Sequence, residues 1–127
     1  MHFPETLQYT KSHEWIRTLS DGKVEIGLTD YAQKALGDLV FVNLPQVGDL
    51  VEPGVSFADV ESVKAVSDVY SPVAGTVYEA NEELMDCPQK INEAPYDAWL
   101  IRVEKAADFE ELLCATQYAQ VIASEEA

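Results

Sequence analysis

The middle of the chain alternates short runs of β-forming residues with turn signals, and this punctuation most constrains the fold. A run over 24–28, after the turn signal at 21–22, alternates apolar with polar or small residues, which is typical of a half-buried strand. Further turn signals follow at 48–49 and 53–54. Runs this short favour strands over helices, so the sequence predicts a mainly β fold.

A predicted hairpin stands out within this region. Two β-type runs, 57–60 and 66–70, flank the segment around Lys64, which is therefore expected at the turn between them. Lys64 is also the only basic residue between Lys34 and Lys90. A lysine at such a turn is commonly just a solvated charge that limits aggregation, so its position alone assigns it no function.

Helical patterns occur near the middle and at the end of the chain. Thr29 or Asp30 caps a predicted short helix that runs through Ala35 and stops at Gly37. Residues 81–92 are expected to be irregular or briefly helical, and the segment 99–103 to form the last strand. Asp108 caps a predicted helical turn carrying Phe109, Leu112 and Leu113, and Thr116 caps a second helix carrying Tyr118, Val121 and Ile122.

The charge balance excludes two classes of partner. Twenty-three acidic residues face eight Lys and Arg, a formal net charge of -15. Nucleic acids and anionic membranes both require a cationic surface, so neither is expected to bind. Such acidity favours a soluble monomer and steers encounters toward basic surfaces of other proteins.

No catalytic or metal-binding constellation is recognisable. Cys87 and Cys114 are far apart, and only His2 and His13 could join them, so no zinc site, other metal site or disulfide framework is predicted. Phosphate-binding loops and nucleophile motifs are missing as well, which favours a carrier or binding module over an enzyme. The sequence lacks a secretory signal, transit peptide or membrane-spanning stretch, so we expect a cytoplasmic protein.

A longer set of motifs carries a family resemblance. The segment at 61–75 reads ESVKAVSDVYSPVAG and closely resembles the lipoylation segment of glycine-cleavage H proteins. Further similarities, in chain order, are SHEW at 12–15, IGLTDYAQ at 26–33, LGDLVFV at 36–42, Asn92-Glu93, Pro95-Tyr96 and Trp99. One departure lies at 95–99, where PYDAW is a residue shorter than the family's usual loop and lacks its glycines.

The resemblance implies a fold and a task. The fold is a lipoyl/biotinyl-type flattened β-barrel/sandwich hybrid with a short N-terminal helix region and C-terminal helices. It would form a single domain over 1–127, with a lipoyl-binding core over 22–104. The task is to carry the aminomethyl group of glycine on lipoic acid attached to Lys64 as N6-lipoyllysine. The chain itself would be a non-catalytic component.

The implied partners are the enzymes of glycine cleavage and of lipoylation. The pyridoxal-phosphate glycine decarboxylase (P protein) loads the arm, and the tetrahydrofolate-dependent aminomethyltransferase (T protein) unloads it. Dihydrolipoyl dehydrogenase (L protein) reoxidises it, and a lipoate ligase or octanoyltransferase attaches it.

Site residues follow from the same resemblance. Ser12, Glu14 and Asp68 match positions that shelter the docked arm, although Glu14 and Asp68 also fit plain solvated strand residues. Expected determinants of the turn and of ligase recognition are Glu61, Ser62, Val63, Ala65 and Gly75. Gly75, which enters a strand, is expected at positive φ or at a tight approach.

Four alternatives remain open at the level of sequence. A lipoyl domain of a 2-oxoacid dehydrogenase shares the Glu-x-x-Lys-Ala pattern but lacks the N-terminal block and the C-terminal helices. A biotin carrier typically has methionines beside its lysine, whereas Lys64 lies between Val63 and Ala65. An H-like protein that donates lipoyl groups to other complexes is the third, and an interaction module with an unmodified Lys64 is the fourth.

Overall fold

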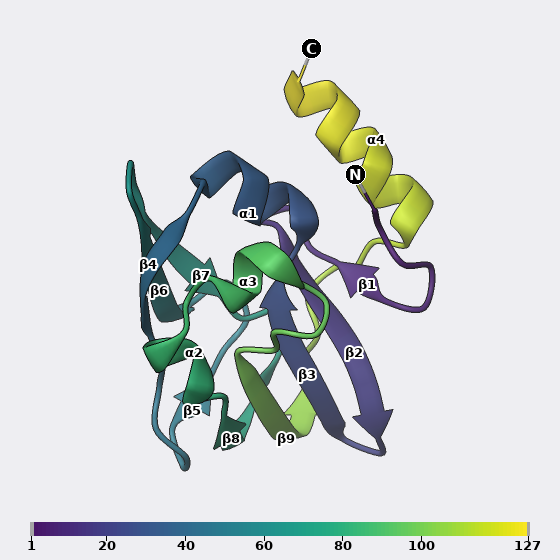
Figure 1. Cartoon of the computed structure of the whole chain (residues 1–127). Helices are drawn as coiled ribbons and strands as arrows, with labels where there is room; N and C mark the ends of the chain where they lie inside the picture. Colours follow the sequence, from purple (N-terminus) through teal and green to yellow (C-terminus); the bar gives the residue numbers. More distant parts are fainter. Residues whose placement is uncertain (1, 127) are drawn as a thin grey trace.

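The computed structural model describes residues 2–126 and has a mainly β architecture, as predicted (Figure 1). One antiparallel sheet has the order β1 (Gln8–Tyr9), β2 (Glu14–Ser20), β3 (Lys23–Leu28), β9 (Ile101–Ala107), β8 (Ala74–Ala80) and β5 (Leu50–Val51). A second antiparallel sheet has the order β4 (Leu39–Asn43), β6 (Ser56–Ser62) and β7 (Val66–Tyr70). Phe57 of β6 packs against the hydrophobic clusters of both sheets.

Strand β3 is buried on both faces, and the prediction of a half-buried strand is wrong here. The Glu25 side chain, expected in solvent, is 4% exposed. It forms ion pairs with Arg17 and Arg102, each at 2.8 Å, which allow the carboxylate to be buried. On the same strand, Gly27 lies directly under the ring of Trp15, and a side chain there would overlap the indole.

Three short helices cover the sheets, and their positions agree with the sequence patterns. Helix α1 (Asp30–Leu36) begins at Thr29, whose hydroxyl accepts a hydrogen bond from the Ala32 N–H. It ends at Gly37, which has a φ of 84° that a residue with a side chain rarely adopts. Helices α2 (Glu83–Asp86) and α3 (Lys90–Glu93) fall in the segment predicted to be irregular or briefly helical.

The C-terminal region corrects one expectation. A single helix, α4 (Ala115–Glu126), follows the last strand, and the helical turn predicted after Asp108 is not formed. Residues 108–114 form no helix, and Leu113 instead exchanges two backbone hydrogen bonds with Tyr9, each 2.8 Å long. Those bonds satisfy the same backbone groups that a helix would have used.

Helix α4 begins two residues earlier than predicted, with Cys114 rather than Thr116 at the cap position, and packs on the N-terminal strand. The Gln117 side chain accepts a hydrogen bond from the Cys114 N–H at 3.0 Å and so caps the helix start. The buried face of the helix presents Tyr118, whose ring stacks on Tyr9 with centroids 4.8 Å apart. No helix in the described part of the chain is both long and apolar enough to cross a membrane.

Candidate functional site

Lys64 lies at the tip of the hairpin formed by β6 and β7, in a turn held by one side chain. The Ser62 hydroxyl accepts hydrogen bonds from the N–H groups of Lys64 at 3.2 Å and Ala65 at 3.0 Å. The Ser62 N–H in turn donates to the Ala65 carbonyl at 2.7 Å. Ser62 is buried while Val63, Lys64 and Ala65 are exposed, so a fixed turn presents the lysine to solvent.

The base of this turn is joined to the segment that follows helix α1 through a second set of contacts. The Val63 N–H donates to the Asp38 carbonyl at 3.1 Å. Asn92 of α3 holds the adjacent residues, because its amide donates to the Gly37 carbonyl and accepts from the Leu39 N–H, both at 2.9 Å. Sequence reasoning assigned no role to Asn92, since only the fold brings it beside the turn.

The stem of Lys64 passes over the end of α1. A Cβ placed on Gly37 would lie 3.6 Å from the Cε of Lys64, so the lysine side chain runs close to this glycine. Gly37 directly follows Leu36, the last residue of α1. The lysine stem therefore lies near the C-terminal end of α1.

A narrow cleft of about 150 Å³ lies along one face of α1. Its walls come from α1, from β7 and from the segment before β2. The lining residues are Ser12, His13, Leu28, Tyr31, Ala32, Ala35, Leu36, Ser67 and Asp68. Apolar side chains of α1 and β3 form one part of the cleft, while Ser12 and Asp68 contribute a hydroxyl and a carboxylate.

Glu14 lies behind this cleft and is fully buried, which excludes its interpretation as a solvated strand residue. Its Oε1 accepts hydrogen bonds from the hydroxyls of Thr10 at 2.6 Å and Ser12 at 2.5 Å. Its Oε2 faces the Tyr70 N–H at 3.4 Å. Burial raises the pKa of Glu14, and the three hydrogen bonds act in the opposite direction. Asp68, by contrast, is exposed.

His13 connects the cleft to helix α4. Its Nδ1 lies 2.8 Å from the Tyr118 hydroxyl, which lies 2.7 Å from the Thr29 hydroxyl, and its Nε2 lies 3.1 Å from a Glu125 oxygen. Burial lowers the pKa of His13, while the Glu125 carboxylate raises it. A neutral ring can donate from Nε2 to Glu125 and accept from Tyr118 at Nδ1, so both ring nitrogens have hydrogen-bond partners without a second proton.

The sequence-predicted residues fall into three places. Ser12, Glu14 and Asp68 converge at the cleft, although Glu14 contacts it only through Ser12. Glu61, Ser62, Val63 and Ala65 surround Lys64 in the hairpin. Gly75 lies apart, on β8 in the other sheet. A side chain on Gly75 would meet Val103 at 2.4 Å and the Glu104 carbonyl at 2.7 Å, so close approach, rather than positive φ, explains this glycine.

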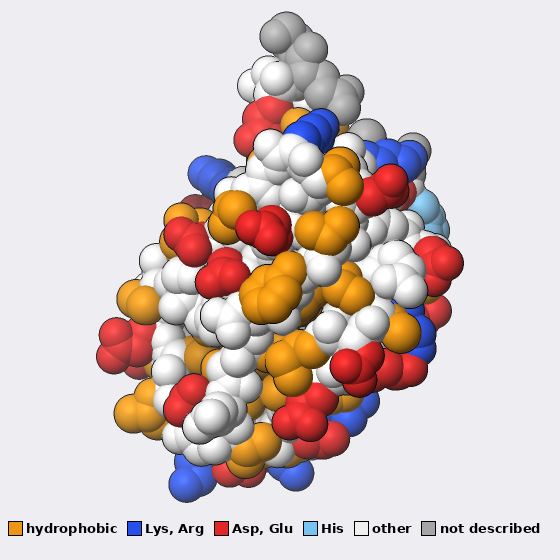
Figure 2. Space-filling model, turned by 60° about the vertical axis from the view of Figure 1, so that its left-hand side comes forward, with side chains coloured by type: hydrophobic (Ala, Val, Ile, Leu, Met, Phe, Trp, Pro, Cys, Tyr) orange, Lys and Arg blue, Asp and Glu red, His pale blue; other side chains and the backbone are white. Residues whose placement is uncertain are grey.

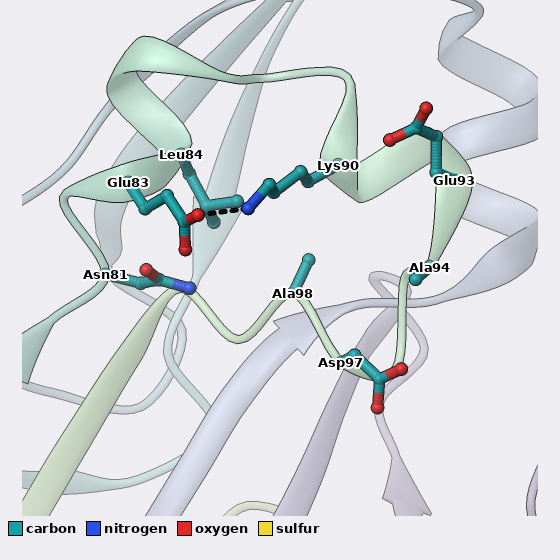
Figure 3. A pocket seen from close by; sticks show the side chains of 8 residues that line it. All are labelled: Asn81, Glu83, Leu84, Lys90, Glu93, Ala94, Asp97 and Ala98. Atoms are coloured by element: carbon teal, nitrogen blue, oxygen red, sulfur yellow. Dashed lines mark hydrogen bonds and ion pairs between the residues drawn. The ribbon is translucent and has the colours of Figure 1, made fainter.

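The loop that departs from the family pattern is firmly anchored. The Trp15 indole donates to the Pro95 carbonyl at 3.0 Å, and Arg17 donates to the Tyr96 carbonyl at 2.9 Å. Its far end borders a separate hollow of about 310 Å³ between α2 and α3, crossed by the Glu83–Lys90 ion pair (Figure 3). Asn81, Leu84, Glu93, Ala94, Asp97 and Ala98 complete its lining.

Comparison with known proteins agrees along almost the whole chain. The family described as "Glycine cleavage H-protein" matches residues 7–125. A glycine cleavage system H protein of Lachnoclostridium phytofermentans is 55% identical over 121 residues, which cover 95% of each chain. A probable glycine cleavage system H protein of Pyrococcus furiosus is 54% identical and covers 93% of this chain and 90% of its own.

A solved structure agrees equally well. The crystal structure of a glycine cleavage system H protein from Mycobacterium marinum aligns with a TM-score of 0.91 at 42% identity, covering 95% of this chain and 99% of that one. The two-sheet architecture thus fits the predicted barrel/sandwich hybrid. With the family match over 7–125 and relatives above 50% identity across nearly their full length, the chain belongs to the glycine cleavage H-protein family.

Proposed function

We propose that this chain is a carrier whose working group is lipoic acid in amide linkage to Lys64. The observation that carries the proposal is an exposed lysine on a fixed turn near a cleft: its stem lies close to Gly37, the residue that follows Leu36 in the cleft lining. A carrier needs both features, because its arm must reach other active sites and also needs a resting place.

Attachment of the arm requires only the amine of Lys64 from this chain. The neutral Nζ attacks the carbonyl carbon of an activated acyl donor, such as an acyl adenylate made from ATP. A C–N bond forms, the bond between the carbonyl carbon and the leaving phosphate oxygen breaks, and the amine proton passes to solvent. The turn held by Ser62 keeps the backbone that bears this amine in a constant position for the ligase or octanoyltransferase.

The cleft residues fit such an arm. Apolar side chains such as Ala35 and Leu36 can cover an aliphatic chain that leaves Lys64 past Gly37. Because the Ser12 hydroxyl donates to Glu14, its lone pairs are left for an amine donor, and Asp68 supplies a negative charge. When bound, the lipoyl group supplies a dithiolane sulfur that carries the aminomethyl cargo. The chain's own contribution is to hold the cargo's ammonium and to limit the access of water.

The proposed partners are those of the family: the P protein that loads the arm, the T protein that unloads it and the L protein that reoxidises it. Within this scheme the chain is non-catalytic and monomeric. We also propose residues 1–127 as one domain with the lipoyl-binding core at 22–104, and the cytoplasm as its location. The family match from 7 to 125 favours this scheme over a 2-oxoacid dehydrogenase lipoyl domain.

Intact-mass measurement tests the attachment. The parent chain, incubated with a lipoate–protein ligase, ATP and lipoic acid, should gain one lipoyl group, and Lys64→Arg should gain none although five of the six lysines remain. Because Lys64 is exposed, Lys64→Ala should change the free energy of unfolding by less than about 0.5 kcal/mol. Modification at another lysine, or none on the parent, would refute the assignment.

An activity assay with the partner enzymes then tests the proposed carrier role in glycine cleavage. The lipoylated parent, mixed with P, T and L proteins, should support release of carbon dioxide from glycine, and Lys64→Arg should not. A lipoylated chain that fails in this assay but passes its lipoyl group to another acceptor domain would instead be a lipoyl relay protein.

A further inference from the structure

Helix α4 lies outside both sheets, and the carrier role leaves its presence unexplained. In Figure 1 it stands at the top of the molecule beside α1, and in the turned view of Figure 2 the same end projects above the body of the molecule. Among the described residues, the two hydrophobic clusters that meet at Phe57 include none from α4, which packs in a third cluster. The polar contacts of α4 with the rest of the chain indicate what it adds.

Tyr118 makes the central polar contacts of the helix. Its side chain is fully buried, and its hydroxyl lies 2.7 Å from the Thr29 hydroxyl and 2.8 Å from Nδ1 of His13. Because the Thr29 oxygen accepts from the Ala32 N–H, the Thr29 proton is available to Tyr118, whose own proton can go to Nδ1 of a neutral His13 ring. Burial raises the pKa of Tyr118, so its hydroxyl keeps that proton. One hydroxyl of α4 thus joins the cap of α1 to the imidazole of His13.

Both partners of Tyr118 belong to the walls of the arm cleft. His13 lines the cleft itself, and Thr29 caps α1, whose side chains line it as well. The backbone already joins these two walls, because the Thr29 N–H donates to the His13 carbonyl at 3.2 Å. That bond does not fix the imidazole ring, which can still rotate about the side-chain bonds of His13. The ring therefore needs contacts of its own.

Three contacts hold the His13 ring, and two of them come from α4. Tyr118 lies at Nδ1, a Glu125 oxygen lies 3.1 Å from Nε2, and the ring of Tyr31, which also lines the cleft, has its centroid 4.8 Å away. The cleft measures only about 150 Å³, so rotation of an imidazole in its wall would either fill it or open it to water. The orientation of this ring therefore decides whether the cleft can receive and shelter an arm.

We propose that Tyr118 is a positioning residue for the carried arm: its hydroxyl fixes the His13 ring in the cleft wall, and α4 thereby keeps water from the docked cargo. This inference rests on the proposed function. A purely structural role for Tyr118 would need only its ring, which stacks on Tyr9 in the third cluster. The hydroxyl is what distinguishes the two roles, and a phenylalanine at this position separates them.

The mobility and lifetime of the loaded arm test the proposal. Lipoylated parent and Tyr118→Phe are loaded by P protein with glycine carrying carbon-13 at its methylene carbon, and the enzyme is removed. The line width of the labelled carbon shows whether it tumbles with the protein or moves freely. Tyr118→Phe should give a narrower line and release formaldehyde about fivefold faster than the parent, as expected when hydrogen bonds that favour docking are lost. Lipoylation by the ligase should be unchanged, because Lys64 lies on the hairpin of β6 and β7.

The matched control is Tyr9→Phe. Tyr9 is equally buried in the same cluster, but its hydroxyl donates to the Pro4 carbonyl at 2.6 Å instead of to the cleft wall. This variant should lose similar stability in thermal melting and hold its cargo like the parent. A second variant, Glu125→Ala, removes the partner of Nε2 at an exposed position and should also hasten release. Glu52→Ala, an exposed glutamate after β5, is its charge-matched control.

Each outcome decides between the roles. If Tyr118→Phe and Glu125→Ala keep the line width and release rate of the parent, the positioning role is refuted and the carrier role stands. If Tyr9→Phe frees the arm as much as Tyr118→Phe does, the cause is a loosened cluster and the proposal is equally refuted. Should Tyr118→Phe fail to fold, Glu125→Ala and its control decide. A parent that takes up no lipoyl group at Lys64 would instead refute the proposed function itself.

Discussion

Glu14 shows how one buried residue can act on the cleft without lining it. Its carboxylate accepts hydrogen bonds from the hydroxyls of both Thr10 and Ser12, which leaves the lone pairs of the Ser12 oxygen free to accept toward the cleft. Replacement by alanine would remove the acceptor of the buried Thr10 hydroxyl and cost ~1–3 kcal/mol of stability. Glu14→Gln keeps the shape of the side chain and one acceptor oxygen. This variant therefore tests the role of the carboxylate in function with less effect on folding.

At this scale we predict that Glu14→Gln and Asp68→Asn shorten the lifetime of the loaded arm. A hydrogen bond to a charged group contributes ~1.5–3 kcal/mol, so its loss should reduce docking roughly tenfold or more. To measure this lifetime, the lipoyl arm is loaded with the aminomethyl group by glycine and P protein, the enzyme is removed, and the release of formaldehyde is followed over time. Asp59→Asn, on the neighbouring strand and outside the cleft, is the control. Equal release from all chains would contradict a sheltering role for these carboxylates.

The arrangement of the strands depends on close contacts between them as well as on the β propensity of their residues. Strand β8 can approach β9 at Gly75 because no side chain separates them. The hairpin of β6 and β7 depends on Ser62, whose hydroxyl accepts the hydrogen bonds of two backbone N–H groups in the turn. Both elements contain strong β formers, so their strands, but not their exact approach, follow from sequence pattern.

At the scale of elements we predict that Gly75→Val destabilises the fold by ~1–3 kcal/mol through overpacking. The added atoms would collide with Val103 and the Glu104 carbonyl, and backbone cannot move aside as a flexible side chain can. Denaturant unfolding of the unmodified chains measures the change. Gly54→Ala, at a position with open space but a φ of 76°, is a useful comparison because it tests backbone strain alone. A midpoint for Gly75→Val equal to that of the parent would remove the close-approach argument.

At the scale of the whole molecule, helix α4 packs against the N-terminal part of the chain. His13 is the polar residue in this contact. Its ring contacts Tyr118 and Glu125 on α4 and lies beside the ring of Tyr31. Thr29, the cap of α1, is linked to it through the Tyr118 hydroxyl. His13 also adopts a φ of 76°, an unusual conformation for a residue with a side chain. The same residue therefore links the arm cleft to the C-terminal helix.

At this scale we predict that part of the stability is lost in mild acid. Because the folded state lowers the pKa of His13 below its usual 6.5, the ring is neutral in both states above that value and the full stability is present there. As pH falls below 6.5 the unfolded chain binds the proton first, so the free energy of unfolding decreases. Urea unfolding at pH 7.5 and 5.5 should show a larger decrease for the parent than for His13→Gln. Equal decreases would mean that His13 does not contribute.

Local chemistry in the sequence determined the strands, the turn around Lys64, the cap at Thr29 and the stop at Gly37, because each depends on neighbouring residues only. The resemblance of longer motifs also allowed the family and the proposed lipoylation site, Lys64, to be predicted from the sequence. The tertiary structure alone decided that Glu14 is buried, that Asn92 supports the turn and that β3 is covered on both faces. It also replaced the predicted helical turn after Asp108 with an irregular segment in which Leu113 pairs with Tyr9. These features depend on contacts between residues far apart in the chain, whose free energy outweighs local preference and leaves no periodic signal in the sequence.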